Sequence, residues 1–218
     1  MVQGIIFDLD GLMFDTEPVW IAAWDVAFSE QGLSFRHDLL PQFFGASHEA
    51  IGKIVDVAYA GDVRALAAVK EHARIGREMM LEQGAAKKPG LDGLLSYAAE
   101  HGIKCAVASA SPKELIHAHL EHGNIEGFFS AIVAGDDGLP SKPAPDVFLE
   151  AARRLGVAPA SAAVLEDSAL GIQAAHAGGF IPIMVPDMVE PTEETRKLAR
   201  FVCRDLHEVR DLLEEGRL

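Results

Sequence analysis

Residues 4–11, GIIFDLDG, decide the fold. A glycine and three apolar residues in a row are typical of a strand buried on both faces of a parallel sheet. Residues i and i+2 of a strand point the same way, so we expect Asp8 and Asp10 to project side by side at its carboxyl end. Burying two like charges together costs free energy unless a cation or a shared proton compensates. Acidic residues before a glycine also form ordinary surface turns, and this stretch alone fits a functional site and a turn equally well.

A second buried-strand run, residues 162–165, also ends in acidic residues, Glu166 and Asp167, followed by Ser168. Two strands of one parallel sheet would therefore bring four carboxylates to the same edge, where open α/β sheets bind ligands. Ligands that are all oxygen select a hard cation, and few protein ligands with room for water suit Mg²⁺ better than Zn²⁺. Asp167 and Ser168 are also good helix-capping residues, and the two roles are compatible.

Two further stretches offer groups that bind anions. Residues 105–111, CAVASAS, end in Ser109, Ala110 and a second serine, where a hydroxyl and the amides of a helix start can hold an anion. Pro112 is predicted at the first position of that helix. Lys142 stands between serine and proline in the string SKPAP. Most lysines are solvated, but a rigid segment that fixes this one near the acidic cluster favours a functional role.

Short apolar runs rich in valine and isoleucine alternate with amphipathic stretches along most of the chain. The runs predict six strands, at residues 3–9, 104–109, 131–134, 162–165, 181–185 and 201–203. The stretches between them predict six helices, at residues 91–101, 112–122, 145–155, 169–177, 193–198 and 206–214. Apolar strands separated by helices indicate a parallel sheet covered on both faces, and right-handed crossovers favour a doubly wound α/β sheet.

Between about residues 18 and 84 the pattern is helical only. A three–four spacing recurs, first at the apolar Trp20, Ala23, Trp24 and Ala27 and later at Leu66, Val69, Ala73 and Arg77. An insert of roughly 70 residues is much longer than an ordinary crossover, and proline and glycine in residues 87–90 mark its end. The sequence predicts an α/β core of residues 1–14 and 90–218, with an all-helical cap of residues 15–89 inserted after the first strand.

The composition excludes several classes of protein. With 33 acidic and 19 basic residues, a formal charge of −14, the chain lacks the basic surface that nucleic acids and anionic membranes attract. Cys105 and Cys203 are too few and too far apart for a disulfide framework and suit a reducing cytosol. Residues 168–186 carry no charged side chain, but their glycines and prolines would break a membrane-spanning helix. We expect a cytoplasmic protein with no targeting signal and no membrane span.

Four longer motifs follow one another along the predicted core. They are FDLDGLMFDTE at 7–17, VASAS at 107–111, SKPAPDVF at 141–148 and LEDSALGIQAA at 165–175. Together they resemble the haloacid dehalogenase superfamily, in its phosphatase and phosphoglucomutase-like branch. The helical insert lies where this family carries its small cap. One such motif would be weak evidence, whereas four in order are highly specific.

The resemblance implies a mechanism of phosphoryl transfer. Asp8 would be the nucleophile that forms an aspartyl-phosphate, and Asp10 would protonate the leaving oxygen and then activate water. Mg²⁺ would be held by the Asp8 carboxylate, the backbone carbonyl of Asp10 and Asp167, with Glu166 assisting directly or through water. The residues implied to bind the phosphoryl oxygens are Ser109, Ala110 and Lys142.

Other residues bear on which reaction of the superfamily is catalysed. Dehalogenases and phosphonate hydrolases of this fold usually lack the second aspartate of the first motif, so Asp10 favours phosphoryl transfer, and Lys53 is expected to be a solvated helix residue. Sugar-phosphate mutases of the branch place a histidine where this chain has Trp20, and a cap arginine whose nearest equivalent here is His48. Hydrolysis of a small phosphomonoester such as a sugar phosphate is the main hypothesis. A β-phosphoglucomutase-type mutase and a non-catalytic phosphate-sensing protein remain alternatives.

Glu17 and His48 are predicted to contact the substrate from the cap. Equally, Glu17 fits a helix N-terminal box ahead of Pro18, and His48 fits an exposed cap residue. The histidines at 117, 119 and 122 are expected on a solvated helix face and not as metal ligands. A small phosphorylated metabolite is the expected partner, with the protein a monomer or a simple homodimer.

Overall fold

The computed structural model describes residues 2–43 and 46–218 of the chain. The chain divides into two compact units, one of Met1–Asp15 with Gly84–Leu218 and the other of Thr16–Gln83. The first is an α/β unit, and the second contains only helices and loops among its described residues. The helical unit therefore ends six residues before the predicted end of the cap at residue 89, because residues 84–89 belong to the α/β unit.

A six-stranded sheet forms the centre of the α/β unit. Its strand order is β5-β4-β1-β6-β7-β8, and every neighbouring pair is parallel. The strands are β1 (Gly4–Phe7), β4 (Lys104–Ala108), β5 (Phe129–Val133), β6 (Ala162–Glu166), β7 (Ile181–Met184) and β8 (Phe201–Val202). All six predicted strands are confirmed, with ends that differ by at most two residues. The order reverses beside β1, which is the switch point at which such sheets bind ligands.

Six α-helices of this unit were each predicted from the sequence, and the last of them, α10, follows the final strand. They are α5 (Leu91–Glu100), α6 (Lys113–His122), α7 (Asp146–Leu155), α8 (Ala169–Ala177), α9 (Glu193–Leu198) and α10 (Leu206–Glu214). Short 3₁₀ turns lie at η2 (Glu126–Phe128), η3 (Gly135–Asp137) and η4 (Pro159–Ser161). One detail was wrong: Pro112 has an extended ψ of 148° and is the N-cap that precedes α6, not its first helical residue.

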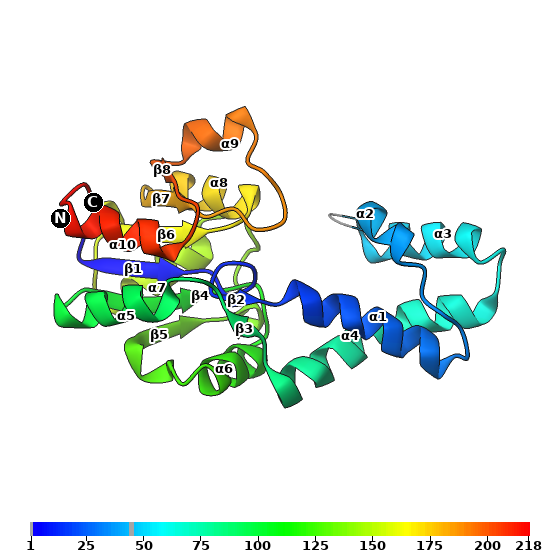
Figure 1. Cartoon of the computed structure of the whole chain (residues 1–218). Helices are drawn as coiled ribbons and strands as arrows, with labels where there is room; N and C mark the ends of the chain where they lie inside the picture. Colours follow the sequence, from blue (N-terminus) through cyan, green and yellow to red (C-terminus); the bar gives the residue numbers. More distant parts are fainter. Residues whose placement is uncertain (1, 44–45) are drawn as a thin grey trace. The chain divides into compact units, whose positions relative to one another are not determined.

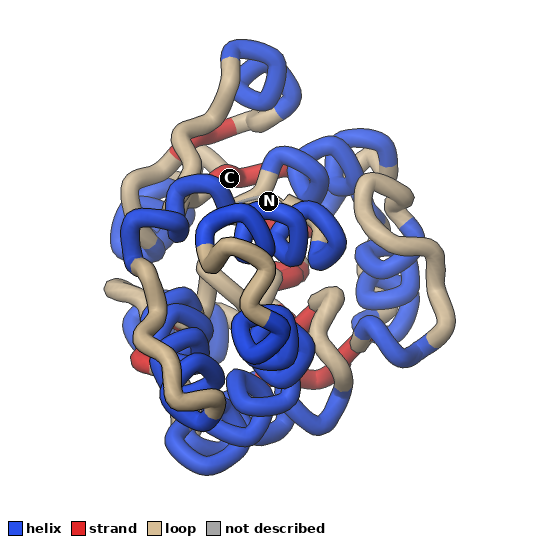
Figure 2. Tube along the Cα trace, turned by 90° about the vertical axis from the view of Figure 1, so that its right-hand side faces the viewer, coloured by secondary structure: helices blue, strands red, loops and turns tan. Residues whose placement is uncertain are grey.

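Side chains that alternate along the central strands fill a separate core on each face of the sheet. From β1, Ile5 and Phe7 pack with residues of α5, α6 and α10, whereas Ile6 packs with residues of α7 and α8. Helices thus cover both faces (Figure 1), which confirms the doubly wound α/β sheet. The two ends of the chain lie close together, as both views show (Figures 1 and 2).

A small ribbon joins the two segments that lead into and out of the helical unit. It pairs β2 (Phe14–Asp15) with β3 (Ala86–Lys87) in antiparallel fashion. The predicted return linker at 87–90 therefore starts within a strand. Sequence patterns missed both strands because two residues are too few to show an alternation.

The helical unit packs around aromatic side chains. Its helices are α1 (Glu17–Glu30), η1 (His37–Leu39), α2 (Leu40–Phe43), α3 (His48–Ala58) and α4 (Val63–Gln83). The predicted inner face of α1 is confirmed at Ala23, Trp24 and Ala27, which are buried. The predicted stripe on α4 was wrong except at Val69, since the buried positions of this helix are Ala65, Ala68, Val69, Ile75, Gly76 and Met80. A Cβ atom at Gly76 would overlap the Trp20 ring, so this glycine lets α1 approach α4 closely.

Two expectations from the composition concern the whole described chain. Within residues 2–43 and 46–218, none of the helices combines the length and the apolar character needed to cross a membrane. Cys105 and Cys203 are both free and buried.

Candidate active site

The pairing of β1 with β6 brings the first and last acidic motifs together. Phe7 is in register with Leu165, and the backbone N–H of Asp8 donates to the Leu165 carbonyl at 3.0 Å. The two strands therefore end at the same level, and Asp8 and Glu166 both lie buried at this edge, with 7% and 1% of their surface exposed. This is the meeting of strand ends that the two motifs predict.

Lys142 lies between these two carboxylates. Its Nζ donates to Asp8 Oδ1 and to Glu166 Oε1, each at 2.5 Å, and lies 3.4 Å from the Ala108 carbonyl. The lysine side chain is only 11% exposed, and its Nζ stands 4.9 Å from the centre of the Phe148 ring. Burial alone would lower the pKa of Lys142, but the two carboxylates outweigh burial and hold it above its ordinary value. Lys142 is therefore a charged member of the cluster, and the solvated alternative is excluded.

Glu166 is fixed by the start of α8 as well as by Lys142. Its Oε2 accepts hydrogen bonds from the Ser168 backbone N–H at 2.9 Å and from the Ser168 hydroxyl at 2.8 Å. Ser168 in turn caps α8, because its Oγ accepts from the Gly171 N–H at 3.0 Å. A Cβ atom at Gly171 would overlap the Glu166 carboxylate, so only glycine leaves room for it. With both oxygens engaged, Glu166 is placed to orient Lys142.

Asp10 and the predicted anion-binding residues meet beyond the end of β4. The Ser111 hydroxyl donates to Asp10 Oδ2 at 2.6 Å, and the Ser111 N–H donates to Ser109 Oγ at 3.0 Å. Ser109, Ala110 and Lys142 together line one cavity of about 80 Å³. The structure therefore brings all three predicted phosphate-binding residues of the α/β unit to one place.

Asp167 lies against the turn that follows β1, together with an acidic residue that the sequence analysis missed. Gly11 has a left-handed φ of 78°, and a Cβ there would come within 2.5 Å of Asp167 Oδ2 and 3.2 Å of Asp187 Oδ2. Asp187 follows β7, the neighbour of β6, and accepts a hydrogen bond from Lys88 at 2.5 Å. Asp187 could have been predicted from its position two residues after a predicted strand. It was missed because a proline separates it from the strand, whereas Asp8 and Glu166 follow their apolar runs directly.

The charges at this edge fit a hard cation. Burial raises the pKa of Asp8 despite the opposing effect of Lys142, and burial followed by repulsion from Glu166 and Asp8 raises the pKa of Asp167. The four acidic side chains predicted at this site thus outnumber the one positively charged side chain, Lys142. Every atom that could bind a cation there is an oxygen. No three His, Cys, Asp or Glu side chains form a metal-holding group within residues 2–43 and 46–218. A cation would therefore rely on two carboxylates, a backbone carbonyl and water, as Mg²⁺ commonly does.

The other two predicted substrate residues, Glu17 and His48, lie in the helical unit. Both line a cavity of about 210 Å³ that is also lined by Trp20, Trp24 and His72. His48 is exposed and begins α3.

His72 is a further lining residue that the sequence analysis missed. Its Nε2 donates to the Trp20 carbonyl at 2.9 Å, and its ring stacks on Trp24 with 3.6 Å between centroids. Burial lowers the pKa of His72, which leaves it neutral with Nδ1 as an acceptor. The spacing of His72, three residues after the buried Val69 and three before the buried Ile75, could have placed it on the inner face of this helix.

Two expectations about isolated residues have different outcomes. Lys53 pairs with Glu49 at 2.6 Å and is 76% exposed, which confirms a solvated helix residue. The expected solvated face of α6 was wrong at His119, which is 1% exposed and stacks on Phe14 with 5.0 Å between centroids. It was missed because Phe14 lies on a two-residue strand that no periodicity reveals.

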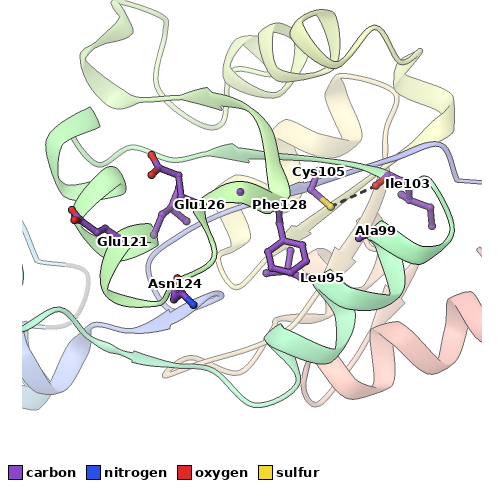
Figure 3. A pocket seen from close by; sticks show the side chains of 10 residues that line it. Leu95, Ala99, Ile103, Cys105, Glu121, Asn124, Glu126 and Phe128 are labelled. Carbon is purple, nitrogen blue, oxygen red and sulfur yellow. Dashed lines mark hydrogen bonds between the residues drawn. The ribbon is translucent and has the colours of Figure 1, made fainter.

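A larger cavity, of about 540 Å³, lies elsewhere in the α/β unit. It opens between α5, α6 and η2, and Figure 3 shows the side chains that line it, among them Phe128 and Leu95, with Glu121 and Glu126 to one side. Cys105, near the start of β4, lines it, so it lies away from the strand ends that carry the acidic motifs. Burial raises the pKa of the Cys105 thiol to about 12, which keeps it protonated. It contains none of the residues predicted for the site.

Comparison with known proteins identifies the family of the chain. The family described as haloacid dehalogenase-like hydrolase matches residues 5–185. The fructose-1-phosphate phosphatase YqaB of Escherichia coli (strain K12) is 34% identical over 178 residues, which cover 81% of this chain and 93% of that protein. Hexitol phosphatase B of the same organism is 31% identical over 211 residues, covering 94% and 90%.

Solved structures share the fold. The beta-phosphoglucomutase (pgmB) of Clostridium difficile superposes with a TM-score of 0.70 at 24% identity, covering 99% of this chain and 96% of that one. CbbY from Rhodobacter sphaeroides superposes with a TM-score of 0.73, also at 24% identity, covering 96% of each chain. Together these matches confirm the resemblance that the four motifs indicate: the chain belongs to the haloacid dehalogenase-like hydrolase family.

Proposed function

We propose that the protein is a Mg²⁺-dependent phosphatase that hydrolyses a small phosphorylated metabolite, a sugar phosphate or a similar phosphomonoester. The observation that carries this proposal is the position of Lys142, whose ammonium contacts Asp8 and also lines the cavity of Ser109 and Ala110. A nucleophilic carboxylate and a cation for the phosphoryl oxygens thus stand side by side. Two relatives above 30% identity are named as phosphatases of a sugar phosphate and of hexitol phosphates, which supports the substrate class.

Asp8 and Asp10 have different chemical roles in this proposal. A carboxylate oxygen of Asp8 attacks phosphorus, the bond to the leaving oxygen breaks, and an aspartyl-phosphate forms. Asp10 gives a proton to the leaving oxygen and then takes one from the water that hydrolyses the aspartyl-phosphate. The hydrogen bond from Ser111 holds Asp10 Oδ2 at 2.6 Å, which leaves the other carboxylate oxygen for this proton transfer.

The remaining residues of the α/β unit bind and neutralise charge. Lys142 and the Ser109–Ala110 segment bind the phosphoryl oxygens, where charge moves during transfer. The residues that would hold Mg²⁺ are Asp8 and Asp167, through their carboxylates, and Asp10, through its backbone carbonyl. When bound, this ion reduces the repulsion between the Asp8 carboxylate and the anionic phosphoryl group. Glu166 orients Lys142 and acts on the ion only through water.

The helical unit is proposed to act as the cap that selects the organic part of the substrate. Its cavity offers Glu17, His48 and the Nδ1 acceptor of His72, groups suited to hydroxyls. None of the described residues that line this cavity is a lysine or an arginine. A second phosphate would find no fixed cation there, and this favours hydrolysis of a monophosphate over a mutase reaction that needs a bisphosphate. The expected cytoplasmic location and the monomeric or dimeric state belong to the same proposal.

The test follows phosphate release and sugar-phosphate isomerisation over a panel of sugar and polyol monophosphates, with Mg²⁺ or with EDTA. The Asp8→Asn variant should lose at least about a thousandfold in Mg²⁺-dependent release. The matched control is Asp211→Asn, an exposed carboxylate on α10, which should leave release unchanged. Unchanged release in Asp8→Asn would overturn the phosphatase. Isomerisation of β-glucose 1-phosphate without release would instead identify a mutase, and phosphate binding with neither reaction would identify a sensing protein.

A further inference from the structure

Lys88 and Asp187 form an ion pair that the proposed function does not use. Lys88 Nζ lies 2.5 Å from Asp187 Oδ1, and the side chains are only 21% and 12% exposed. The two residues are 99 positions apart in the sequence. A surface pair contributes little to stability, so the burial of this one calls for another explanation.

The pair is anchored to the elements that carry the acidic motifs. The backbone N–H of Lys88 donates to the Met13 carbonyl at 2.9 Å, which ties it to the turn after β1. Asp187 stands two residues after Val185, whose N–H donates to the Glu166 carbonyl at 2.8 Å. Lys88 is therefore held by a backbone contact to the turn after β1, and Asp187 closely follows a residue that is bonded to the last residue of β6.

Asp187 lies beside Gly11, next to the candidate cation site. Its Oδ2 and Asp167 Oδ2 approach the same face of this glycine, at 3.2 and 2.5 Å from where a Cβ would stand. Two carboxylates this close repel each other, and Lys88 compensates by holding the other oxygen of Asp187. Asp15 also faces Lys88, but at 4.0 Å. Three neighbouring strands, β1, β6 and β7, thus each supply a carboxylate to this edge.

We infer that Lys88 and Asp187 are positioning residues of the cation site, which fix a carboxylate beside Asp167 and so set the affinity of the site for Mg²⁺. This inference rests on the proposed function, because it concerns the same cation. Neither residue lines the cavity of Ser109, Ala110 and Lys142, the residues proposed to bind the phosphoryl oxygens. Groups that orient metal ligands from behind typically change metal affinity by about 10- to 100-fold when they are replaced.

The sign of the change separates positioning from simple electrostatics. If the pair acts only through its charges, loss of Lys88 should tighten Mg²⁺ binding and loss of Asp187 should weaken it. If the pair acts by holding Asp187 in place, Lys88→Met and Asp187→Asn should both weaken binding. The double variant should then lose no more than either single variant, because the two residues act as one unit.

The experiment measures the Kd for Mg²⁺ alone by titration calorimetry on the full chain, and the thermal midpoint of the Mg²⁺-free protein beside it. We expect both single variants and the double variant to raise the Kd by about tenfold, and Asp187→Glu to recover part of the loss. The matched control is the adjacent pair Lys87–Asp92, 2.7 Å apart, in which the aspartate is 64% exposed. Lys87→Met and Asp92→Asn should leave the Kd unchanged.

Two results would overturn the inference: an unchanged Kd in Asp187→Asn, or shifts of opposite sign in the two single variants. Asp187→Asn keeps the size of the side chain, so it can still overturn the inference, through an unchanged Kd, even if Lys88→Met does not fold. A parent protein that binds no Mg²⁺ would instead overturn the proposed function, and the two failures are thus distinguishable.

Discussion

The two units of this chain bury different kinds of side chain. The α/β unit buries Asp8, Ser109, His119, Glu166 and Thr195, whereas Thr16 is the one buried polar side chain among the described residues of the helical unit. In the helical unit, Trp24 stacks on Phe35 with 5.5 Å between centroids, while ion pairs such as Lys53–Glu49 stay on the surface. Burying charge opposes folding, so its concentration in one unit indicates where the chemistry is done. The helical unit offers shape and neutral acceptors instead.

Removing Lys142 should have the largest effect of the changes that test this contrast. Lys142→Met leaves Asp8 and Glu166 buried without their shared cation. We expect phosphate release to fall by at least about a hundredfold and the free energy of unfolding to fall by about 3 kcal/mol. Kinetic assays and urea unfolding measure the two losses.

The matched change in the helical unit is Lys53→Met, which breaks an exposed pair. It should alter the free energy of unfolding by less than about 0.5 kcal/mol. Equal effects of the two lysine variants on stability would show that the burial of charge in the α/β unit is not what distinguishes the two units.

The substitution Gly171→Ala should have the next largest effect on phosphate release. Gly171→Ala places a Cβ in the space of the Glu166 carboxylate, so Glu166 must leave Ser168 or Lys142. We expect phosphate release to fall by about a hundredfold while the secondary structure seen by circular dichroism is kept. Activity close to that of the parent would mean that Glu166 can move without disturbing Lys142.

The sheet and its acidic edge could be predicted because two local signals point the same way. Apolar strand runs such as residues 162–165 mark the strands, and the polar residue that follows each run marks the edge. Parallel pairing then brings Asp8 and Glu166 together without further information. Lys142 could be predicted only as a candidate, since its contacts depend on how a proline-rich loop folds back onto β1.

The other features of the sites could not be predicted, because they depend on contacts between residues far apart in the sequence. His72 belongs to the inner face of α4, but the sequence pattern places that face at Leu66 and Ala73, which are not among the buried residues of this helix. Asp187 and Lys88 each look like solvated surface residues until the fold joins them across 99 positions. His119 looks solvated until β2 brings Phe14 against it.

Protonation of His119 should oppose the folding of the α/β unit in acid. Burial lowers the pKa of His119 below its ordinary value of 6.5, with His122 acting in the same direction and Asp10 opposing both. The folded state therefore binds this proton more weakly than the unfolded state, so stability is complete above pH 6.5 and falls as the pH drops below it. Each tenfold difference in proton affinity between the two states corresponds to about 1.4 kcal/mol.

Urea unfolding followed by circular dichroism between pH 5 and 7.5 measures this loss. His119→Leu should remove this contribution, so that the variant loses less stability than the parent as the pH falls, because leucine carries no proton in either state. His72→Leu is the counterpart in the helical unit, where burial also lowers the pKa. An unchanged slope in His119→Leu would assign the acid sensitivity of the α/β unit to other groups.

Gly52→Ala should have a small effect, of the opposite sign to that of Gly171→Ala. Gly52 lies within α3, and a Cβ there would meet no atom within 4 Å. Alanine is favoured over glycine within a helix, so we expect the helical unit to gain about 0.5–1 kcal/mol. The two tryptophans of the chain, Trp20 and Trp24, both lie in this unit, and their fluorescence in urea therefore reports its unfolding separately. The same added methyl group is thus expected to stabilise a helix where space is free and to disable a site where a carboxylate fills that space. A loss of stability in Gly52→Ala would contradict this distinction between the two units.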